Sequence, residues 1–198
     1  MSGANTLDRR AVVAALLRDR GDLLVVAGLG APAWDATAAG DNPLTFPLWG
    51  AMGSAAMVGL GLALVQSKRG VLVLTGDGEM LMGMGSLATI GVQRPANLSL
   101  AVLDNERYGE TGMQPTHTAH GIDLAAVAAG CGFAASQTIR EMAGVAALAA
   151  RLKAREGPLF AQIKIAADGK SLVLPPRDGP LLKNRFRAAL LGPQAAVE

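Results

Sequence analysis

The sequence predicts an α/β fold, specifically a three-layer, doubly wound arrangement with a mainly parallel sheet. Short apolar runs alternate with helical stretches along the chain, which is the pattern of repeated βα units. Of the residues, 51% are hydrophobic and 17% are charged, so the chain has enough apolar material for a sizeable core. A length of 198 residues fits one domain. We therefore expect a single domain over residues 1–198, with a C-terminal extension from about residue 167.

The predicted strands are short apolar runs, three of which are followed by Gly, Asp or Asn. The four clearest are 23–27, 71–75, 98–103 and 159–165. Two further short strands are expected at 45–46 and 132–135. The segments 28–49 and 106–121 are polar or rich in Gly and Pro, which predicts long loops.

The predicted helices fill most of the intervals between the strands. The first is amphipathic, covers 7–18 and has Thr6 placed as its N-cap. The segment 52–66 is apolar and contains glycines, which predicts a buried helix in close contact with neighbouring backbone. The remaining helices are expected at 80–92, which is rich in Met, at 123–129, at 141–154 and, after a Pro-rich link, at 181–191.

Composition excludes several classes of protein. The single cysteine, Cys131, excludes an internal disulfide framework, and its Gly-flanked setting predicts a small packed residue in a reducing compartment. Basic residues are scattered, so we expect no nucleic-acid partner. No leader is visible, and the longest apolar run, 51–65, is shorter than a membrane span of about 20 residues. We expect a soluble, cytoplasmic protein whose charge-poor surface is partly buried against another chain.

Two consecutive predicted strands end in side chains that carry oxygen ligands. Asp77 follows the first of them and lies between Gly76 and Gly78, and Asp104 and Asn105 follow the second. One helical crossover separates these strands, so we expect them to be neighbours with both ends at the same edge of the sheet. Carboxylate and amide oxygens suit Mg²⁺, and the glycines expose backbone N–H groups to an anion. The sequence therefore predicts a site for a diphosphate–Mg²⁺ complex.

Each of these motifs alone is more typical of an ordinary turn or polar loop, and only their spacing after two strands favours a site. The glycines of the segment 28–33 also match a dinucleotide-binding fingerprint. That fingerprint requires an acidic residue at the end of the next strand, and the segment 42–48 contains none. A nucleotide-binding protein therefore stays the weaker alternative.

The segment from Gly76 to Asn105 resembles the cofactor signature of thiamine-diphosphate enzymes. The signature usually ends in two asparagines, and here the first is Asp104. The resemblance implies that Mg²⁺ is bound by Asp77, by Asn105 and by the main-chain carbonyl of Arg107. It also implies that Gly76 and Gly78 lie against the diphosphate. Glu79 would donate its N–H to the diphosphate and point its carboxylate away.

The resemblance extends to other parts of the chain. The segment 46–53 is similar to the one that meets the aminopyrimidine ring of the cofactor in this family. The similarity implies that the Gly50 carbonyl accepts a hydrogen bond from the amino group of that ring. It also implies that the Met52 side chain wedges between the two rings of the cofactor. The alternative interpretation of Met52 is that it is a core methionine at the start of a helix. The loop after the first strand would donate the N–H groups of Gly28 and Leu29 to the diphosphate.

Residues 103–116 resemble a narrower group, the sulfopyruvate and phosphonopyruvate decarboxylases, and the similarity covers 7–165. It implies an enzyme that releases CO₂ from a small 2-oxo acid, most simply 3-sulfopyruvate to sulfoacetaldehyde. A phosphonopyruvate decarboxylase, a carboligase subunit and a non-catalytic cofactor-binding protein are the alternatives. The loop from Gly109 would close over the diphosphate, with Tyr108 at its base as a cofactor contact or a packed aromatic.

The resemblance also implies a missing component. The glutamate that activates thiamine diphosphate belongs to a separate pyrimidine-binding domain, which this chain lacks, so we expect a partner alpha subunit. His117 and His120 are possible proton donors or substrate contacts, although a solvated loop is the simpler interpretation. Two histidines and one distant cysteine do not make a zinc site.

Overall fold

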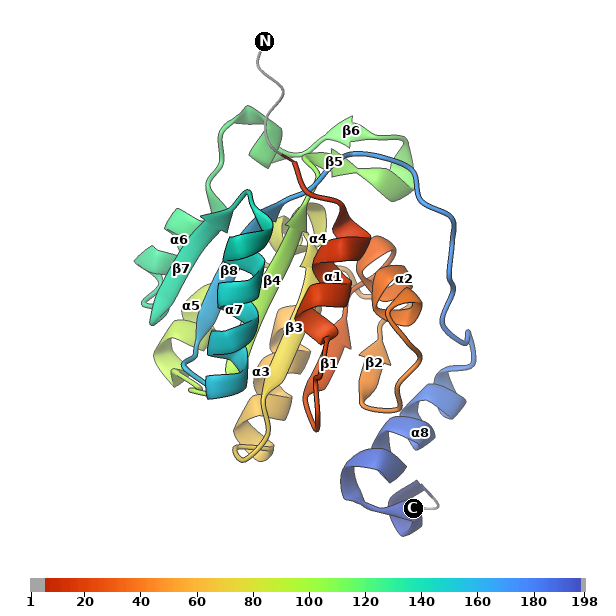
Figure 1. The fold of residues 1–198 in the computed structure, drawn as a ribbon. Coiled ribbons are helices and arrows are strands. Elements are labelled where there is room, and N and C mark those ends of the chain that lie inside the picture. The colour runs from red at the N-terminus through yellow and green to blue at the C-terminus, as the bar shows by residue number, and fades with distance from the viewer. Residues whose placement is uncertain (1–5, 197–198) are drawn as a thin grey trace.

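Six strands form one parallel sheet in the computed structural model, which describes residues 6–196. In sheet order the strands are β2 (Thr45–Pro47), β1 (Leu24–Ala27), β3 (Val71–Gly76), β4 (Leu98–Asp104), β8 (Leu159–Lys164) and β7 (Ala135–Ile139). Every neighbouring pair in this sheet is parallel. The predicted α/β class with a doubly wound parallel sheet is confirmed (Figure 1).

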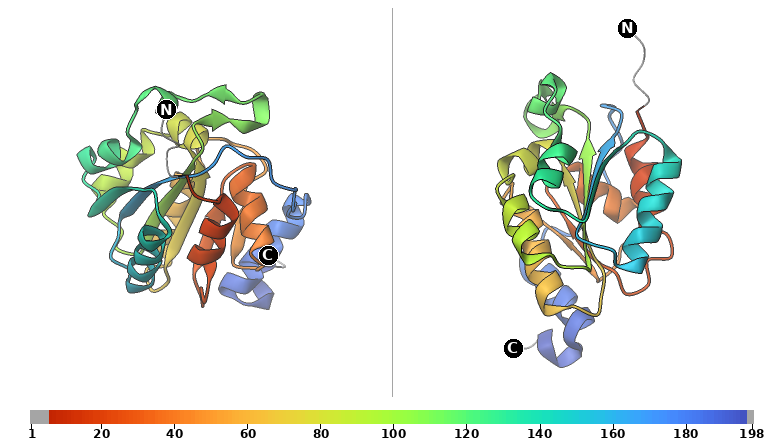
Figure 2. Two further views of the ribbon diagram at one scale, coloured as in Figure 1. Left: turned by 45° about the horizontal axis from the view of Figure 1, so that its top comes forward. Right: turned by 90° about the vertical axis from the view of Figure 1, so that its left-hand side faces the viewer.

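Helices cover both faces of the sheet and make three layers (Figure 2). One layer contains α1 (Arg9–Leu17), α2 (Ala31–Ala38) and α7 (Met142–Ala154). The other contains α3 (Ala55–Val65), α4 (Asp77–Met82), α5 (Ser86–Gln93) and α6 (Leu124–Gly130). Alternate strand residues enter the two cores, so Leu72 and Leu74 pack in one apolar cluster while Val71 and Val73 pack in the other. The strands are thus apolar without interruption because both of their faces are buried.

The remaining elements lie at the ends of the sheet. A small hairpin of β5 (Arg107–Tyr108) and β6 (Gln114–Pro115) and the 3₁₀ helices η1 (Gly109–Thr111) and η2 (His117–His120) follow β4. After β8, residues 167–178 form an irregular segment, which we call the C-terminal strap. It leads to α8 (Gly179–Leu191) and the short η3 (Pro193–Ala196). Helix α8 packs on β2, where the Phe46 and Phe186 ring centroids are 5.4 Å apart.

The expected loop 28–49 is wrong over part of its length, because it contains α2. Gly30 precedes this helix with φ +78°, and a proline occupies its first turn, where the missing N–H costs nothing. Asp35 of α2 is fully buried and pairs with Arg9 and Arg10 of α1 at 2.8 and 3.1 Å. Ion pairs with another helix thus hold α2 in place. No local sequence pattern reveals these pairs.

The start of the first helix also differs from the prediction. Asp8, not Thr6, is the N-cap, and its side chain accepts from the Ala11 N–H. Leu7 is extended because it forms a parallel bridge with Ile165, directly after β8. The prediction that no signal peptide is visible rests mostly on residues 1–5, and these lie outside the described residues.

Glycines explain three further differences. The expected helix 80–92 is two helices, since Gly83 in the break lies so close to Gly53 that a Cβ would be 2.0 Å from its carbonyl oxygen. The apolar helix expected at 52–66 begins only at Ala55. The edge strand expected at 132–135 is present as β7, but it begins only at Ala135 and runs to Ile139, because Gly132 turns the chain with φ +90°.

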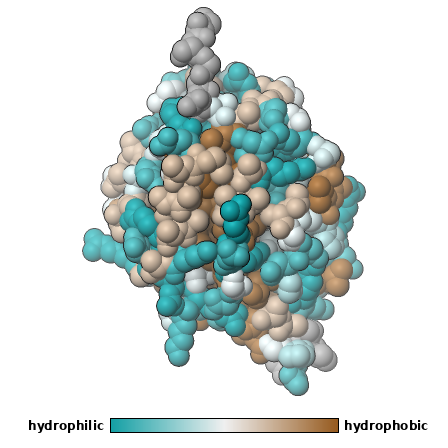
Figure 3. Space-filling view, viewed as in Figure 1, coloured by the Kyte–Doolittle hydropathy of each residue, from teal (hydrophilic) through white to brown (hydrophobic). Residues whose placement is uncertain are grey.

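Over residues 6–196, no helix is long and apolar enough to cross a bilayer. On the face in Figure 3, hydrophilic residues are spread between smaller hydrophobic areas. Cys131 is a free, half-buried cysteine packed against the core cluster on the α5–α6 side, as its sequence setting predicts.

Candidate functional site

A pocket lies at the carboxyl ends of β1, β3 and β4, where open parallel sheets bind ligands. The predicted adjacency of β3 and β4 is confirmed, with Gly76 opposite Leu103. Most of the predicted site residues line this pocket: Leu29, Met52, Gly76, Asp77, Gly78, Glu79, Asn105, Arg107, Tyr108 and Gly109. The structure thus gathers predicted site residues from four separate segments at one edge of the sheet.

Asp77 is a buried carboxylate with no counter-ion among residues 6–196. Its side chain is 2% exposed, and its Oδ2 accepts from Thr116 Oγ1 at 2.6 Å and lies 3.3 Å from Thr118 Oγ1, whose single proton has a shorter contact with Asp104. No lysine, arginine or histidine among residues 6–196 forms an ion pair with it. Burial, with a further contribution from the nearby Asp104 charge, raises the pKa of the Asp77 carboxyl to about 6 against the Thr116 hydrogen bond. The arrangement suits a cation that compensates this charge.

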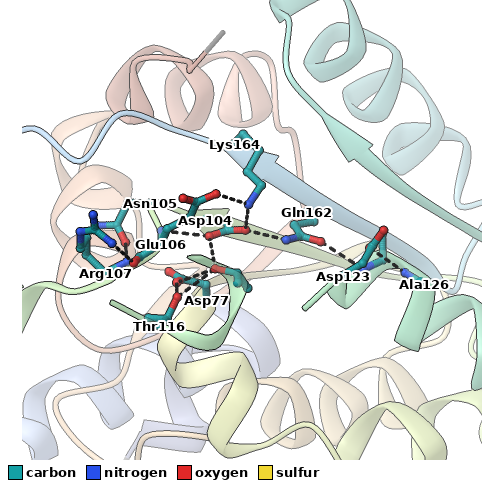
Figure 4. Close-up of polar contacts among 12 residues, drawn as sticks. Asp77, Asp104, Asn105, Glu106, Arg107, Thr116, Asp123, Ala126, Gln162 and Lys164 are labelled. Carbon is teal, nitrogen blue, oxygen red and sulfur yellow. Dashed lines mark hydrogen bonds and ion pairs between the residues drawn. The ribbon is translucent and has the colours of Figure 1, made fainter. Parts of the chain in front are cut away.

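Asp104 is also fully buried, but it has a full set of partners (Figure 4). Its Oδ1 accepts from the Glu106 N–H at 3.0 Å and from Thr118 Oγ1 at 2.8 Å. Its Oδ2 accepts from Gln162 Nε2 and from Lys164 Nζ, the latter at 2.7 Å. Asp104 therefore anchors the end of β4 to β8 and to η2.

The turn after β4 points Asn105 and Arg107 toward the pocket. Asn105 Oδ1 accepts from the Arg107 N–H at 3.0 Å, and Glu106 between them has φ +62°. Arg107 and Pro115 form a non-hydrogen-bonded pair of the hairpin, because the flanking bond runs from the Thr116 N–H to the Glu106 carbonyl, so the hairpin ladder does not use the Arg107 carbonyl. The amide oxygen of Asn105 keeps a second lone pair. Both oxygens are thus available to a ligand.

Gly78 and Tyr108 are in direct contact. A Cβ on Gly78 would lie 2.6 Å from Cε1 of the Tyr108 ring, so only glycine allows this packing. The half-buried Tyr108 ring therefore lies over the start of α4, at the base of the loop that begins at Gly109. Gly109 itself is exposed.

Glu79 is buried beneath the loop after β1. Its Oε2 accepts from Thr75 Oγ1 at 2.8 Å, and the backbone of Gly53 and Ala55 also lies close enough to favour the charged carboxylate. Burial raises the pKa of its carboxyl, against the Thr75 hydrogen bond. The carboxylate fills the space where a side chain on Gly28 would lie, since a Cβ there would be 1.7 Å from Oε2. Gly28 is thus required by the packing of Glu79.

The expected role of the Gly28 N–H needs correction. This N–H donates to the Leu74 carbonyl at 2.8 Å within the sheet, so it is not free for a diphosphate. Leu29, the next residue, lines the pocket. The loop after β1 therefore reaches the site through Leu29.

The segment expected to meet the pyrimidine ring lies at the rim. Met52 lines the pocket and is 37% exposed, and Gly50 is exposed just outside the lining. Trp49 is anchored to the C-terminal strap: its Nε1 donates to the Pro176 carbonyl at 2.7 Å, and Arg177 lies 5.6 Å from its ring centroid. An exposed Met52 favours the rim position over the alternative of a core methionine.

The two histidines lie apart from this lining. His117 and His120 are both exposed on η2, whose threonines rather than histidines face the buried acids. Within residues 6–196, no three His, Cys, Asp or Glu side chains converge as a metal site. A cation at Asp77 would therefore depend on amide and carbonyl oxygens.

Comparison with known proteins decides the family. The sequence model for the thiamine pyrophosphate enzyme C-terminal TPP-binding domain matches residues 33–163. The chain belongs to the thiamine pyrophosphate enzyme family. The predicted enzyme class, a thiamine-diphosphate-dependent carboxy-lyase, is also confirmed, because similar proteins in this family are decarboxylases.

Two named relatives show how the chain compares within the thiamine pyrophosphate enzymes. The sulfopyruvate decarboxylase subunit beta of Methanothermobacter thermautotrophicus is 38% identical over 165 residues, covering 83% of this chain and 85% of the relative. The phosphonopyruvate decarboxylase of Streptomyces viridochromogenes is 38% identical over 177 residues, covering 89% of this chain but 44% of the relative. The chain thus spans less than half of that longer enzyme.

The fold agrees with this family. A thiamin-diphosphate-dependent enzyme from Mycobacterium smegmatis superposes with a TM-score of 0.69 at 22% identity, covering 82% of this chain and 32% of that one. The described sheet is therefore that of a thiamine pyrophosphate enzyme domain.

Sequence reasoning missed the polar residues that support the two strand ends. These are Thr116, Thr118, Gln162 and Lys164, all of them buried. Gln162 and Lys164 alternate on the otherwise apolar strand β8, and this spacing was a usable signal, because polar side chains on a buried strand need partners. The threonines gave no such signal, since they lie in a loop whose conformation was not predictable.

Proposed function

We propose that this chain is the diphosphate- and Mg²⁺-binding subunit of a thiamine-diphosphate-dependent 2-oxo acid decarboxylase, active with a second polypeptide that carries the pyrimidine-binding domain. One observation carries the proposal. Asp77 is a buried carboxylate without a counter-ion in the described part of the chain, and it lines the same pocket as Asn105 from the neighbouring strand end. A divalent cation would compensate a buried charge that otherwise destabilises the fold.

The metal would be held by oxygen atoms alone. Asp77 would supply a carboxylate, Asn105 its amide oxygen and Arg107 the carbonyl that the hairpin leaves unused. Such a set is incomplete for an octahedral ion, which suits Mg²⁺ because it commonly completes its shell with phosphate oxygens and water. The pocket residues thus fit a Mg²⁺–diphosphate complex better than zinc.

Thiamine diphosphate would occupy the pocket and its rim, where it supplies the electron acceptor for loss of CO₂. Leu29, Gly76, Gly78 and Glu79 would bind the diphosphate through backbone groups. Gly50 and Met52 would meet the pyrimidine side, and Tyr108 and Gly109 would close over the diphosphate and exclude water. These roles of the chain are to bind and to orient. The Glu79 carboxylate, held by Thr75, would take no part in binding the anion.

Three observations support a partner subunit. The pocket encloses about 110 Å³, which is small beside the ~300–1,000 Å³ typical of small-molecule sites. Met57 and Met82 line a shallow hollow together with Gly53, the residue after Met52, and all three methionines are exposed. The relative from Methanothermobacter carries the name of a subunit. We propose that a pyrimidine-domain alpha subunit covers this edge, and that residues 1–198 are one domain with the C-terminal strap and α8 as its extension.

The substrate we propose is 3-sulfopyruvate, which would yield sulfoacetaldehyde and CO₂. The 38% identity to a sulfopyruvate decarboxylase subunit over most of both chains supports this choice. Phosphonopyruvate is the second candidate, since the phosphonopyruvate decarboxylase is equally similar over a longer alignment. His117 and His120 are exposed near the site and stay possible proton donors. We propose that the reaction takes place in the cytoplasm.

A combined binding and activity experiment tests the proposal. The chain is co-expressed with its candidate alpha subunit, and CO₂ release is measured from sulfopyruvate, phosphonopyruvate and pyruvate. Calorimetry on the same complex measures binding of thiamine diphosphate with and without Mg²⁺, and of NAD. We expect Mg²⁺-dependent cofactor binding that Asp77→Ala abolishes. Full activity of Asp77→Ala, or tight NAD binding without Mg²⁺, would reject the assignment, and binding without CO₂ release from any substrate would favour a non-catalytic protein.

A further inference from the structure

The two buried aspartates at the site have opposite charge environments. Asp77 accepts from a threonine hydroxyl group and has no cationic partner among residues 6–196. Asp104 is paired with Lys164, whose side chain is 8% exposed, at 2.7 Å. Thr118 Oγ1 lies within hydrogen-bond distance of both carboxylates. Two carboxylates that lie this close in a buried site repel each other strongly. A cation paired with one carboxylate therefore changes the electrostatic energy of the other.

We propose that Lys164 is the charge-balancing residue of the metal site: it neutralises Asp104, so that Asp77 alone presents an uncompensated negative charge to the divalent cation. This inference rests on the proposed function, because it requires a cation at Asp77. It assigns a role in metal binding to a residue that does not line the pocket.

The sheet register fixes Lys164 in this position. Asp104 and Lys164 are direct partners in the parallel pairing of β4 with β8, so their side chains leave the same face of the sheet. Gln162 lies two residues before Lys164 on that face and donates to Asp104 as well. Gln162 is itself held by the Ala125 N–H at 3.2 Å. Lys164 is therefore constrained to face Asp104.

The second partner of Lys164 does not explain its burial. Glu106 Oε1 lies 2.8 Å from Lys164 Nζ, but the Glu106 side chain is 43% exposed. Exposed partners contribute little, whereas a buried ammonium that loses its buried partner is costly. The pairing with Asp104 is thus the interaction that justifies a lysine on a buried strand.

Charge arithmetic links Lys164 to the departure from the family signature. An aspartate in place of the first asparagine adds one negative charge beside the metal, and Lys164 adds one positive charge at bonding distance. The pair is neutral in sum. The site then keeps the net charge that an uncharged residue at position 104 would give it.

Divalent-cation binding to the full-length chain at low ionic strength tests the inference. The probe is Mn²⁺ alone, measured by electron paramagnetic resonance and displaced by Mg²⁺. The variants are Asp104→Asn, Lys164→Met and the double variant, with Lys164→Arg as the charge-conserving control. Circular dichroism and the melting temperature of each variant report folding separately.

The two single variants should change affinity in opposite directions. Asp104→Asn leaves an extra positive charge and should weaken Mn²⁺ binding on the order of tenfold, while Lys164→Met leaves an extra negative charge and should strengthen it several-fold. The double variant and Lys164→Arg should bind within about threefold of wild type. If the pair only joins β4 to β8, both single variants will instead weaken binding in step with their loss of stability, which overturns the inference.

The same data separate this inference from the proposed function. Wild-type binding that Asp77→Asn abolishes, combined with shifts of equal sign in the two single variants, rejects the role of Lys164 and leaves the metal site intact. Absence of Mn²⁺ binding to wild type, or its retention in Asp77→Asn, rejects the metal site and with it the role of Lys164.

Discussion

The Tyr108 ring lies against the Cα of Gly78, where the added Cβ of any other residue would be 2.6 Å from ring carbon Cε1. This contact joins the first turn of α4, which follows β3, to the loop that follows β4. The two strand ends are thus fixed relative to one another by packing as well as by the Thr116 and Thr118 hydroxyl groups.

Gly78→Ala should displace the Tyr108 ring and open the pocket. Overpacking of this kind typically costs about 1–3 kcal/mol of unfolding free energy. We expect thiamine diphosphate to bind the complex more weakly, as measured by calorimetry. Gly85→Ala is the matched control, because nothing lies within 4 Å of a Cβ there and its φ is ordinary. Equal effects of the two alanines would contradict the contact with Tyr108.

Asp77 should make the metal-free chain less stable as the pH rises. Burial raises the pKa of its carboxyl from 3.8 to about 6, so the folded chain holds this proton more tightly than the unfolded chain does. The resulting stability is present at low pH and is lost as the pH rises through about 6, by at most about 3 kcal/mol. Urea unfolding with a chelator at about pH 5 and about pH 7.5 measures the difference.

Asp77→Asn removes this titrating carboxyl while keeping the size and shape of the side chain. The variant should lose less stability than wild type between the two pH values, by more than about 1 kcal/mol. At the higher pH it should be the more stable protein, as expected for a residue retained for binding rather than for folding. Identical slopes in the two proteins would show that the charge of Asp77 is already compensated.

Two helix glycines should respond to alanine with opposite signs. A Cβ on Gly91 in α5 would lie 1.7 Å from the Cys131 carbonyl oxygen, so Gly91→Ala should separate α5 from the end of α6. Gly61 in α3 is exposed and has open space around it, so Gly61→Ala should stabilise the helix by up to about 1 kcal/mol. Thermal unfolding compares the two, and a stable Gly91→Ala protein would contradict the close α5–α6 approach.

Trp49→Phe should loosen the rim of the pocket. The change removes the indole N–H bond to Pro176, worth about 1 kcal/mol, and weakens the stacking of Arg177. Hydrogen exchange at residues 48–54 should accelerate, while exchange within β8 stays as in wild type. Trp34→Phe is the matched control, and an equal acceleration in both variants would exclude the strap as the cause.

The sheet was predictable because its strands carry their own signal. Each core strand is a short, uninterrupted apolar run, and β3 and β4 end in the residues that identify the family. The predicted neighbourhood of Asp77 and Asn105 followed from topology alone, because one crossover leaves few alternatives. The distances and partners at the site required coordinates.

Features that depend on distant residues were not predictable. Helix α2 is held by Arg9 and Arg10, whose sequence positions give no hint of a partner at Asp35. The hydrogen bond from the Gly28 N–H to the Leu74 carbonyl depends on the register of β1 with β3. Local sequence patterns report local preferences, and each of these features is a contact between separate elements.

The position of α8 has a consequence for biosynthesis. Helix α8 packs on β2, the outermost strand at one side of the sheet, through Phe186 and Phe46. A ribosome releases β2 well before α8, so nascent chains present an uncovered border strand until α8 has emerged. Uncovered border strands readily pair with other chains. A chain that is truncated before residue 179 should therefore form inclusion bodies rather than a soluble protein with reduced activity.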